Sequence, residues 1–195
     1  MKRIGVLALQ GAFREHLDIL NQLGTESVPV RLPGELEGVD GLVIPGGEST
    51  TIGKLLKEYE LAAPLQRMIA DGMPVLGTCA GMILLASDVI GLNGYSLGAV
   101  DIQVRRNAFG RQVESFEADL HIPALGDAPF HAVFIRAPWI EKTGHDVQVL
   151  ARLENGTPVA ARSGNIVLAA FHPELTSDTR LHSYFVDIVN SRLHQ

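Results

Sequence analysis

The sequence has little cysteine, no long apolar run and no concentration of positive charge. A single cysteine among 195 residues rules out an internal disulfide, and a reducing compartment such as the cytoplasm is expected. No apolar segment approaches the roughly 20 residues needed to span a bilayer. Lys and Arg number 16 against 22 Asp and Glu, giving a formal net charge of -6 with no basic run. Neither nucleic acid nor an anionic membrane is an expected partner.

The histidines are too scattered to indicate a metal site. Besides His172, they stand at positions 16, 121, 131, 145, 182 and 194, without metal-ligand spacing and without a second cysteine. The sequence therefore predicts no metal ion, and it suggests no other cofactor.

Apolar segments alternate with helical patterns in the first half, which is typical of a parallel sheet covered by helices. Predicted strands lie at residues 3–9, 28–32, 41–44, 74–78, 132–136, 147–153, 157–162 and 165–171. Predicted helices cover residues 13–23 and 80–86, and a further helix includes 52–59. Another helix ends near Gly72, and the last one follows Ser177. Without repeats or a linker, residues 1–195 are expected to form a single α/β domain with an open, mostly parallel sheet flanked by helices.

Residues 99–122 change to strict alternation of apolar and polar side chains. The alternating apolar positions are Val100, Ile102 and Val104 on the way out, and Phe116, Ala118, Leu120 and Ile122 on the return. This pattern predicts an antiparallel ribbon that turns around Asn107–Gly110.

The only cysteine lies in Gly77–Gly81, a G-x-C-x-G segment between a predicted strand and a predicted helix. Serine hydrolases carry their nucleophile on such a turn, where flanking glycines let the backbone pass closely. The helix starting at Ala80 would favour an ionised sulfur at Cys79. The alternative, a small buried apolar cysteine, is common for isolated cysteines, but Gly on both sides makes the nucleophile the better interpretation.

A nucleophilic cysteine needs a base and a group that orients the base. His172 and Glu174 follow the apolar strand at 165–171, and residues two apart in an extended segment point to the same side. We expect both at the carboxyl edge of the sheet, close to Cys79. Alone, the H-x-E pattern would be an ordinary surface feature.

The glycine-rich segment Pro45–Thr51 follows the predicted strand at 41–44. It is not a phosphate loop, because the spacing from Gly47 to Lys54 is one residue too long and Leu55 stands where a hydroxyl is required. The better interpretation is an oxyanion hole formed by the N–H groups of Gly47 and Ala80. A plain turn remains the alternative.

These motifs together resemble the class I, Cys-His-Glu glutamine amidotransferases. Further segments are similar to the glutaminase subunits of pyridoxal 5'-phosphate synthase: Leu9–Gly11, Pro45–Thr51, Arg106–Gln112, Phe134–Pro138 and Ala170–Thr176. The likeness runs from the first strand to the last helix, and no motif position departs from it. It implies a flavodoxin-like three-layer sandwich.

The resemblance also implies a function and a partner. The chain would hydrolyse L-glutamine and pass ammonia to a barrel-shaped synthase subunit in a large hetero-oligomer, and it would be nearly inactive when isolated. Cys79, His172 and Glu174 would be catalytic. Residues implied to contact glutamine are Gly46, Gly47, Glu48, Arg106, Ile135 and Arg136.

The strand pattern independently favours Arg106 over Arg105 as a ligand for an anion. If the strand from Val100 continues, Arg106 turns toward the apolar side with Val104, while Arg105 faces water. An inward guanidinium needs an anionic partner, such as the glutamine α-carboxylate. The alternative is a pair of solvated arginines at the end of a ribbon.

Three other functions remain open from the sequence. The chain could serve another acceptor synthase, or it could be a cysteine hydrolase of the protease or chaperone-like branch. It could also be a binding module without catalysis. The Gly46–Gly47 loop gives no support to the protease branch, and the intact set of Cys79, His172 and Glu174 argues against a binding module.

Overall fold

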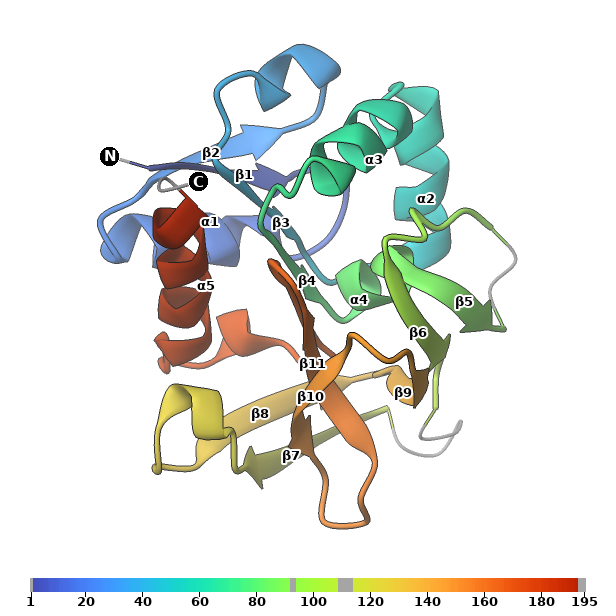
Figure 1. Cartoon of the computed structure of the whole chain (residues 1–195), viewed down its shortest axis with the longest axis vertical. Coiled ribbons are helices and arrows are strands. Elements are labelled where there is room, and N and C mark those ends of the chain that lie inside the picture. The colour runs from blue at the N-terminus through green and yellow to red at the C-terminus, as the bar shows by residue number, and fades with distance from the viewer. Residues whose placement is uncertain (1, 92–93, 109–113, 193–195) are drawn as a thin grey trace.

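The computed structural model describes residues 2–91, 94–108 and 114–192, and its largest element is a seven-stranded sheet (Figure 1). The strands of this sheet are β1 (Arg3–Leu7), β2 (Glu26–Val30), β3 (Gly41–Ile44), β4 (Val75–Thr78), β10 (Gln148–Arg152), β11 (Pro158–Ser163) and β12 (Ile166–Ala169). Their order is β10-β11-β12-β4-β3-β1-β2. The strands from β12 to β2 are parallel, whereas β11 pairs antiparallel with both β10 and β12.

Helices cover both faces of this sheet. They are α1 (Phe13–Gln22), α2 (Ser49–Glu58), α3 (Ala62–Ala70), α4 (Ala80–Leu85) and α5 (Arg180–Ser191). In Figure 1, α1 and α5 lie on one side of β3 and β4, and α2, α3 and α4 lie on the other. The predicted class, a mostly parallel sheet flanked by helices, is confirmed. Within the described ranges, no helix is long and apolar enough to cross a membrane.

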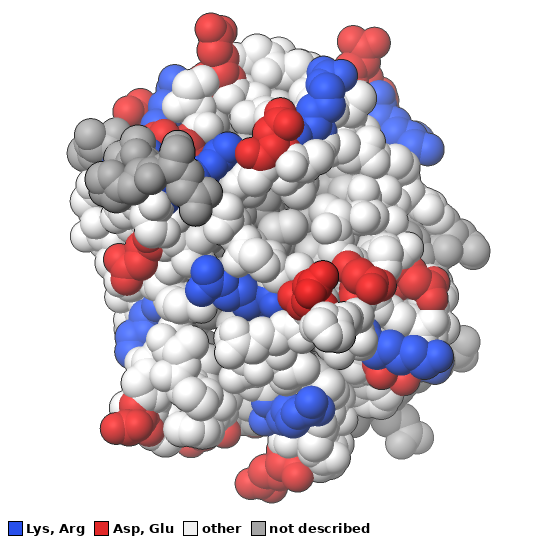
Figure 2. Space-filling view, viewed as in Figure 1, with Lys and Arg blue, Asp and Glu red and all other residues white. Residues whose placement is uncertain are grey.

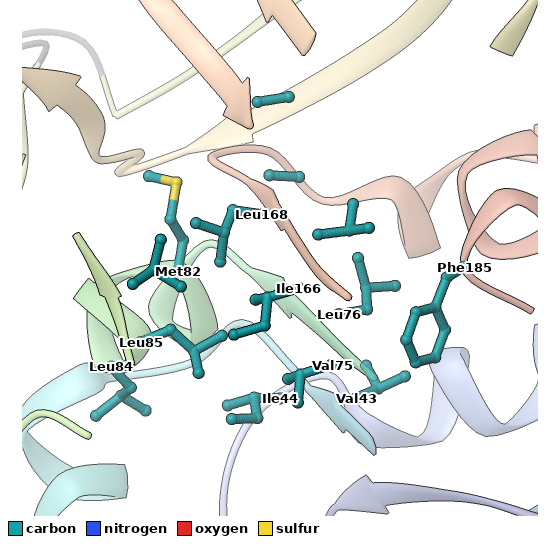
Figure 3. Close-up of a cluster of buried hydrophobic side chains, with 14 of the residues drawn as sticks. Val43, Ile44, Val75, Leu76, Met82, Leu84, Leu85, Ile166, Leu168 and Phe185 are labelled. Atoms are coloured by element: carbon teal, nitrogen blue, oxygen red, sulfur yellow. The ribbon is translucent and has the colours of Figure 1, made fainter. Parts of the chain in front are cut away.

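The central strands are buried on both faces, which is why they appear in the sequence as continuous apolar runs. Figure 3 shows Phe185 of α5 beside Val43 and Leu76, while Leu85 and Met82 of α4 approach from the opposite direction. These side chains belong to one hydrophobic cluster that extends through the sheet. The core therefore fixes α4, and with it the turn that precedes α4.

Two smaller sheets adjoin the main one. The first contains β5 (Ala86–Ile90), β6 (Val100–Arg105) and β9 (Trp139–Thr143), in the order β5-β6-β9. The second pairs β7 (Ser115–Leu120) with β8 (Phe130–Ile135). Short 3₁₀ helices complete the described elements: η1 (Pro33–Leu36), η2 (Pro123–Leu125) and η3 (Pro173–Leu175).

The predicted ribbon across residues 99–122 is wrong in its pairing. Val100, Ile102 and Val104 are buried as the alternation indicates. However, β6 pairs with β5 and β9, while β7 pairs with β8. Alternation reports which residues share a face, but it does not choose the neighbouring strand. Of the predicted turn, Phe109 and Gly110 lie outside the described residues.

The other predicted strands and helices are present, with ends that differ by a few residues. Gly24 follows α1 with a positive φ of 76°, a conformation in which glycine commonly ends a helix. The prediction missed β5 and β9, which are short edge strands of the first small sheet.

Candidate active site

The segments that follow β3, β4 and β12 converge at one edge of the main sheet. The three strands are parallel neighbours with β4 in the middle, so their carboxyl ends lie together. Beyond these ends stand the Gly46–Gly47 pair, Cys79 and His172, respectively. The backbone N–H of Cys79 donates to the carbonyl of Ala169 at 2.8 Å, which ties the turn after β4 to the end of β12.

Cys79 occupies a strained turn between β4 and α4. Its φ of 47° and ψ of -103° are unusual for a residue that carries a side chain. Neighbouring glycines make this turn possible: a Cβ on Gly77 would lie 2.6 Å from Leu85 Cδ1, and one on Gly81 would overlap the carbonyl oxygen of Ile44. The G-x-C-x-G pattern thus has a steric cause at both glycines.

His172 and Glu174 are in contact, although not on an extended strand as predicted. His172 Nδ1 lies 2.7 Å from Glu174 Oε1, and the two residues are 8% and 6% exposed. Pro173–Leu175 forms the 3₁₀ helix η3, so a tight turn brings the carboxylate back to the imidazole. Because a deprotonated carboxylate only accepts hydrogen bonds, Nδ1 carries the proton and Nε2 is left for Cys79.

The surroundings of His172 favour its cationic form. Burial opposes that charge, but hydrogen bonds with Cys79 and Glu174 outweigh it and raise the pKa of His172 to about 10. At neutral pH this geometry supports an imidazolium beside Cys79, placed to act as a proton donor. The carbonyl oxygen of Ile135 lies 3.9 Å from Cys79 Sγ.

Gly46 packs directly against this pair. A Cβ at Gly46 would overlap His172 Cε1 and would lie 3.3 Å from Cys79 Cβ. On the other side, the Gly46 carbonyl accepts a hydrogen bond of 3.1 Å from the backbone N–H of Ala12. The Gly46–Gly47 peptide is trans, so the Gly47 N–H points away from the Ala12 side.

Glu48 and Arg106 form the outer part of the site. The Glu48 side chain caps α2 by accepting from Thr50 N at 3.1 Å and Thr51 N at 2.7 Å. Partial burial opposes ionisation, but the hydrogen bonds from Thr51 and Thr50 outweigh it and lower the pKa of Glu48. Arg106 Nη2 lies 3.2 Å from Glu48 Oε1, and Arg106 Nη1 lies 3.3 Å from Thr50 Oγ1.

The two neighbouring arginines point in different directions, as the strand pattern indicates. The Arg106 side chain is 20% exposed, whereas Arg105 is 44% exposed and pairs with Glu141. The anionic partner of Arg106 in this structure is Glu48. Arg136 turns outward, with a side chain 70% exposed beside Glu114 and a positive φ of 45°. Its backbone N–H donates to the Glu114 carbonyl at 2.6 Å.

Several polar residues around the site were given no role in it by the sequence reasoning. Gln10 Oε1 accepts from the Glu48 N–H at 2.7 Å, and the buried histidines His16 and His182 lie 2.8 Å apart behind Glu174. The signal was present for both histidines. His16 shares the apolar face of α1 with Leu20, and His182 shares that of α5 with Phe185.

Among the residues that the structure describes, no three His, Cys, Asp or Glu side chains are grouped so that they could hold a metal ion. The expectation of a site without metal remains a prediction.

Comparisons with known proteins agree with this arrangement. Residues 6–191 match the model of the SNO glutamine amidotransferase family. The chain is 56% identical to "Pyridoxal 5'-phosphate synthase subunit PdxT" of Moorella thermoacetica, over 96% of this chain and 99% of that protein. It is 60% identical to the protein of that name from Pelotomaculum thermopropionicum, over 95% of this chain and 94% of that protein. A solved structure described as a glutamine amidotransferase superposes with a TM-score of 0.91 at 49% identity, over 96% of this chain and 98% of that one.

Proposed function

The chain belongs to the SNO glutamine amidotransferase family, and we propose that it is the glutaminase subunit of a pyridoxal 5'-phosphate synthase. It hydrolyses L-glutamine to L-glutamate and ammonia, and the ammonia serves vitamin B6 biosynthesis in a separate synthase subunit. The observation that carries this proposal is the buried contact of His172 with Glu174 at 2.7 Å beside Cys79, which sits on the strained turn after β4.

The reaction begins with attack of the Cys79 thiolate on the side-chain amide carbon of glutamine. His172 gives its Nε2 proton to the departing nitrogen, which leaves as ammonia, and a thioester remains on Cys79. His172, now neutral, then takes a proton from water, which attacks the thioester. Glutamate departs, and the thiolate and imidazolium are restored. Glu174 holds the imidazole in one tautomer throughout.

The N–H groups of Gly47 and Ala80 are the proposed oxyanion hole. Ala80 is the first residue of α4, so its N–H has no acceptor within the helix. The Gly47 N–H points away from Ala12, because the carbonyl of the same peptide is held by Ala12. Ala80 directly follows Cys79, and Gly46 packs against Cys79, which supports the proposal that these two amides stabilise a developing negative oxygen.

The outer residues are proposed to hold the α-amino acid end of glutamine. Arg106 provides a guanidinium for the α-carboxylate, and the Glu48 carboxylate beside it can accept from the α-ammonium group. Gly46 and Gly47 would line the path of the side chain, because a larger residue at Gly46 would overlap His172. The Ile135 carbonyl and the Arg136 backbone would close the opposite side.

The partner is proposed to be a barrel-shaped synthase subunit in a large hetero-oligomer, and the cytoplasm is the proposed location. The relatives named above support a synthase partner. Nucleic acid is not proposed, because Figure 2 shows Lys and Arg interspersed with Asp and Glu on the face in view, without a broad basic area.

Replacement of the nucleophile tests the proposed function. Cys79→Ala removes the only sulfur that can form the thioester, so glutaminase activity should disappear. The assay measures ammonia and glutamate with a pyridoxal 5'-phosphate synthase subunit present, because the isolated chain is expected to be nearly inactive. His145→Ala, at a fully exposed position, is the control and should keep wild-type activity.

Cys79→Ala should still bind the synthase, and the complex should still make product when an ammonium salt replaces glutamine. Residual glutaminase activity near the wild-type level in Cys79→Ala would overturn the proposed function.

A further inference from the structure

Three buried polar residues lie behind the catalytic pair and have no role in the reaction described above. His16 on α1, His182 on α5 and Thr78 on β4 are each 0% exposed. His16 Nδ1 lies 2.8 Å from His182 Nε2, and His16 Nε2 lies 3.3 Å from Thr78 Oγ1. His16 Nε2 also lies 3.4 Å from Glu174 Oε2, the carboxylate oxygen that does not contact His172.

Glu174 Oε2 needs a donor from this cluster. It is a buried oxygen without a well-formed hydrogen bond from any described residue, and a buried charge without compensation is costly. The nitrogen at 3.4 Å is His16 Nε2, and contacts of this kind tighten when a substrate is bound. Both oxygens of the carboxylate would then be held, one by His172 and one by His16.

The second histidine determines which tautomer His16 adopts. If His182 Nε2–H donates to His16 Nδ1, His16 carries its proton on Nε2, facing Glu174 and Thr78. His182 Nδ1 has no hydrogen-bond partner among the described residues, and in this arrangement it is an unpaired acceptor rather than an unpaired donor. The opposite arrangement would bury an unpaired N–H at His182 and would set a lone pair of His16 against the carboxylate. The first arrangement is the favourable one.

We propose that His16 is a positioning residue of the glutaminase site, in which its Nε2–H holds Oε2 of Glu174 and so fixes the carboxylate that orients His172. His182 keeps His16 in the required tautomer, and Thr78 Oγ1 is a second acceptor for the His16 Nε2–H. The chain of contacts thereby extends from Cys79 to α5. This proposal rests on the proposed function, since it assigns His16 a role in the same reaction.

Two substitutions of His16 separate this role from simple packing. In His16→Gln the side-chain amide nitrogen reaches the position of Nε2 and can still donate to Glu174. In His16→Asn the shorter amide reaches only the position of Nδ1, so the donor to Glu174 is lost while the residue stays polar and uncharged. His121→Asn, at an exposed position, is the matched control.

The first measurement is glutamine hydrolysis with the synthase subunit present. His16→Asn should lower kcat by at least about tenfold with little change in KM, because glutamine itself is not touched. His16→Gln should stay within about threefold of the wild type, and His121→Asn should match the wild type. Circular dichroism defines a temperature at which all four proteins are folded, and the assays are run there.

The second measurement is the pH dependence of Cys79 alkylation by iodoacetamide, made on the full chain alone. In His16→Asn the rise of the rate should move to higher pH, because a loosely held Glu174 supports the imidazolium beside the sulfur less well. In His16→Gln it should not move.

Equal kcat values in the two His16 variants, or an alkylation profile that His16→Asn leaves unchanged, would overturn the role of His16. If the wild-type complex does not hydrolyse glutamine, the proposed function fails instead, and the alkylation profiles still decide whether His16 supports the cysteine–histidine pair.

Discussion

At the scale of single residues, the site depends on positions where a side chain does not fit. Gly81 lies against the Ile44 carbonyl, and Gly46 lies against His172 and Cys79. These two glycines have different effects. The first lets α4 pack against the sheet, whereas the second leaves room for the imidazole to approach the sulfur.

Gly46→Ala should therefore lower activity more than stability. The added methyl group would overlap His172 Cε1 and displace the base from Cys79. We expect kcat to fall by about 100-fold, since the geometry of the base is among the larger contributions to catalysis. Gly34→Ala is the control, because a Cβ there would have no described atom within 4 Å apart from its chain neighbours. Steady-state kinetics that show equal kcat for both variants would contradict the assigned contact.

The buried histidines should make stability depend on pH. Burial lowers the pKa of His182 to about 4, and burial together with the neighbouring His182 and His172 lowers the pKa of His16 well below 6.5. As pH falls below 6.5, His16 and His182 bind protons in the unfolded chain but stay neutral in the folded one, so the folded state loses stability. The window for His182 runs from 6.5 down to about 4 and corresponds to roughly 3 kcal/mol. The raised pKa of His172 changes the pH dependence of stability only above pH 6.5, outside this window.

His182→Gln should weaken this acid sensitivity. Urea unfolding at about pH 7 and about pH 4.5 measures the loss of unfolding free energy, which should be smaller in the variant by roughly 2 kcal/mol. His121→Gln, at an exposed position, should lose as much as the wild type. If all three proteins lose the same amount, His182 is not neutral in the folded state.

At the scale of elements, β8 connects the small second sheet to the active site. Its Phe130 and Phe134 both contact Phe171, with ring centroids 5.6 Å apart in each pair. The next residue, His172, donates its backbone N–H to the Val133 carbonyl at 2.8 Å. Packing and hydrogen bonding therefore hold the base against β8.

Phe130→Ala should reduce both stability and activity. Removing this fully buried ring should cost about 3–5 kcal/mol and loosen the hold of β8 on His172, so kcat should also fall. Phe116→Ala is the comparison: Phe116 is half-buried on β7 and stacks on Phe134. It should cost less stability and leave kcat near the wild type. Chemical unfolding and kinetics on both variants test this, and an unchanged kcat in Phe130→Ala would refute it.

The sequence predicted those elements whose signals are local. Cys79 with Gly77 and Gly81 could be identified because a sharp turn requires nearby residues. The contact of His172 with Glu174 could be predicted because the residues are two apart, although η3 produces it by a different conformation. The neighbours of β6 and β7 in their sheets could not be predicted, because strand pairing depends on segments that are distant in the chain. For the same reason the contact of His16 with Glu174 was missed.

At the scale of the whole molecule, the three sheets share one hydrophobic cluster. Ile102 and Val104 of β6, Phe130 and Phe134 of β8, and Leu168 of β12 all belong to it. A core of this kind is typical of a single cooperative unit. This arrangement supports the prediction that residues 1–195 form one domain.

The only tryptophan provides a test of this cooperativity. Trp139 lies on β9, so its fluorescence reports on the first small sheet. Far-ultraviolet circular dichroism instead reports mainly on the main sheet and its helices. Urea unfolding followed by both signals should give coincident transitions with one midpoint. Two separated midpoints would show that the small sheet unfolds independently and would contradict a single domain.

The hydrogen bond from the His172 N–H to the Val133 carbonyl has an evolutionary consequence. Both atoms belong to the main chain, so ordinary substitutions at either position leave this anchor of the base intact. An inserted or deleted residue within β8 would turn the carbonyl to the other edge of the strand and remove it. This hydrogen bond therefore constrains the length of β8 more strictly than the identity of the side chain at Val133.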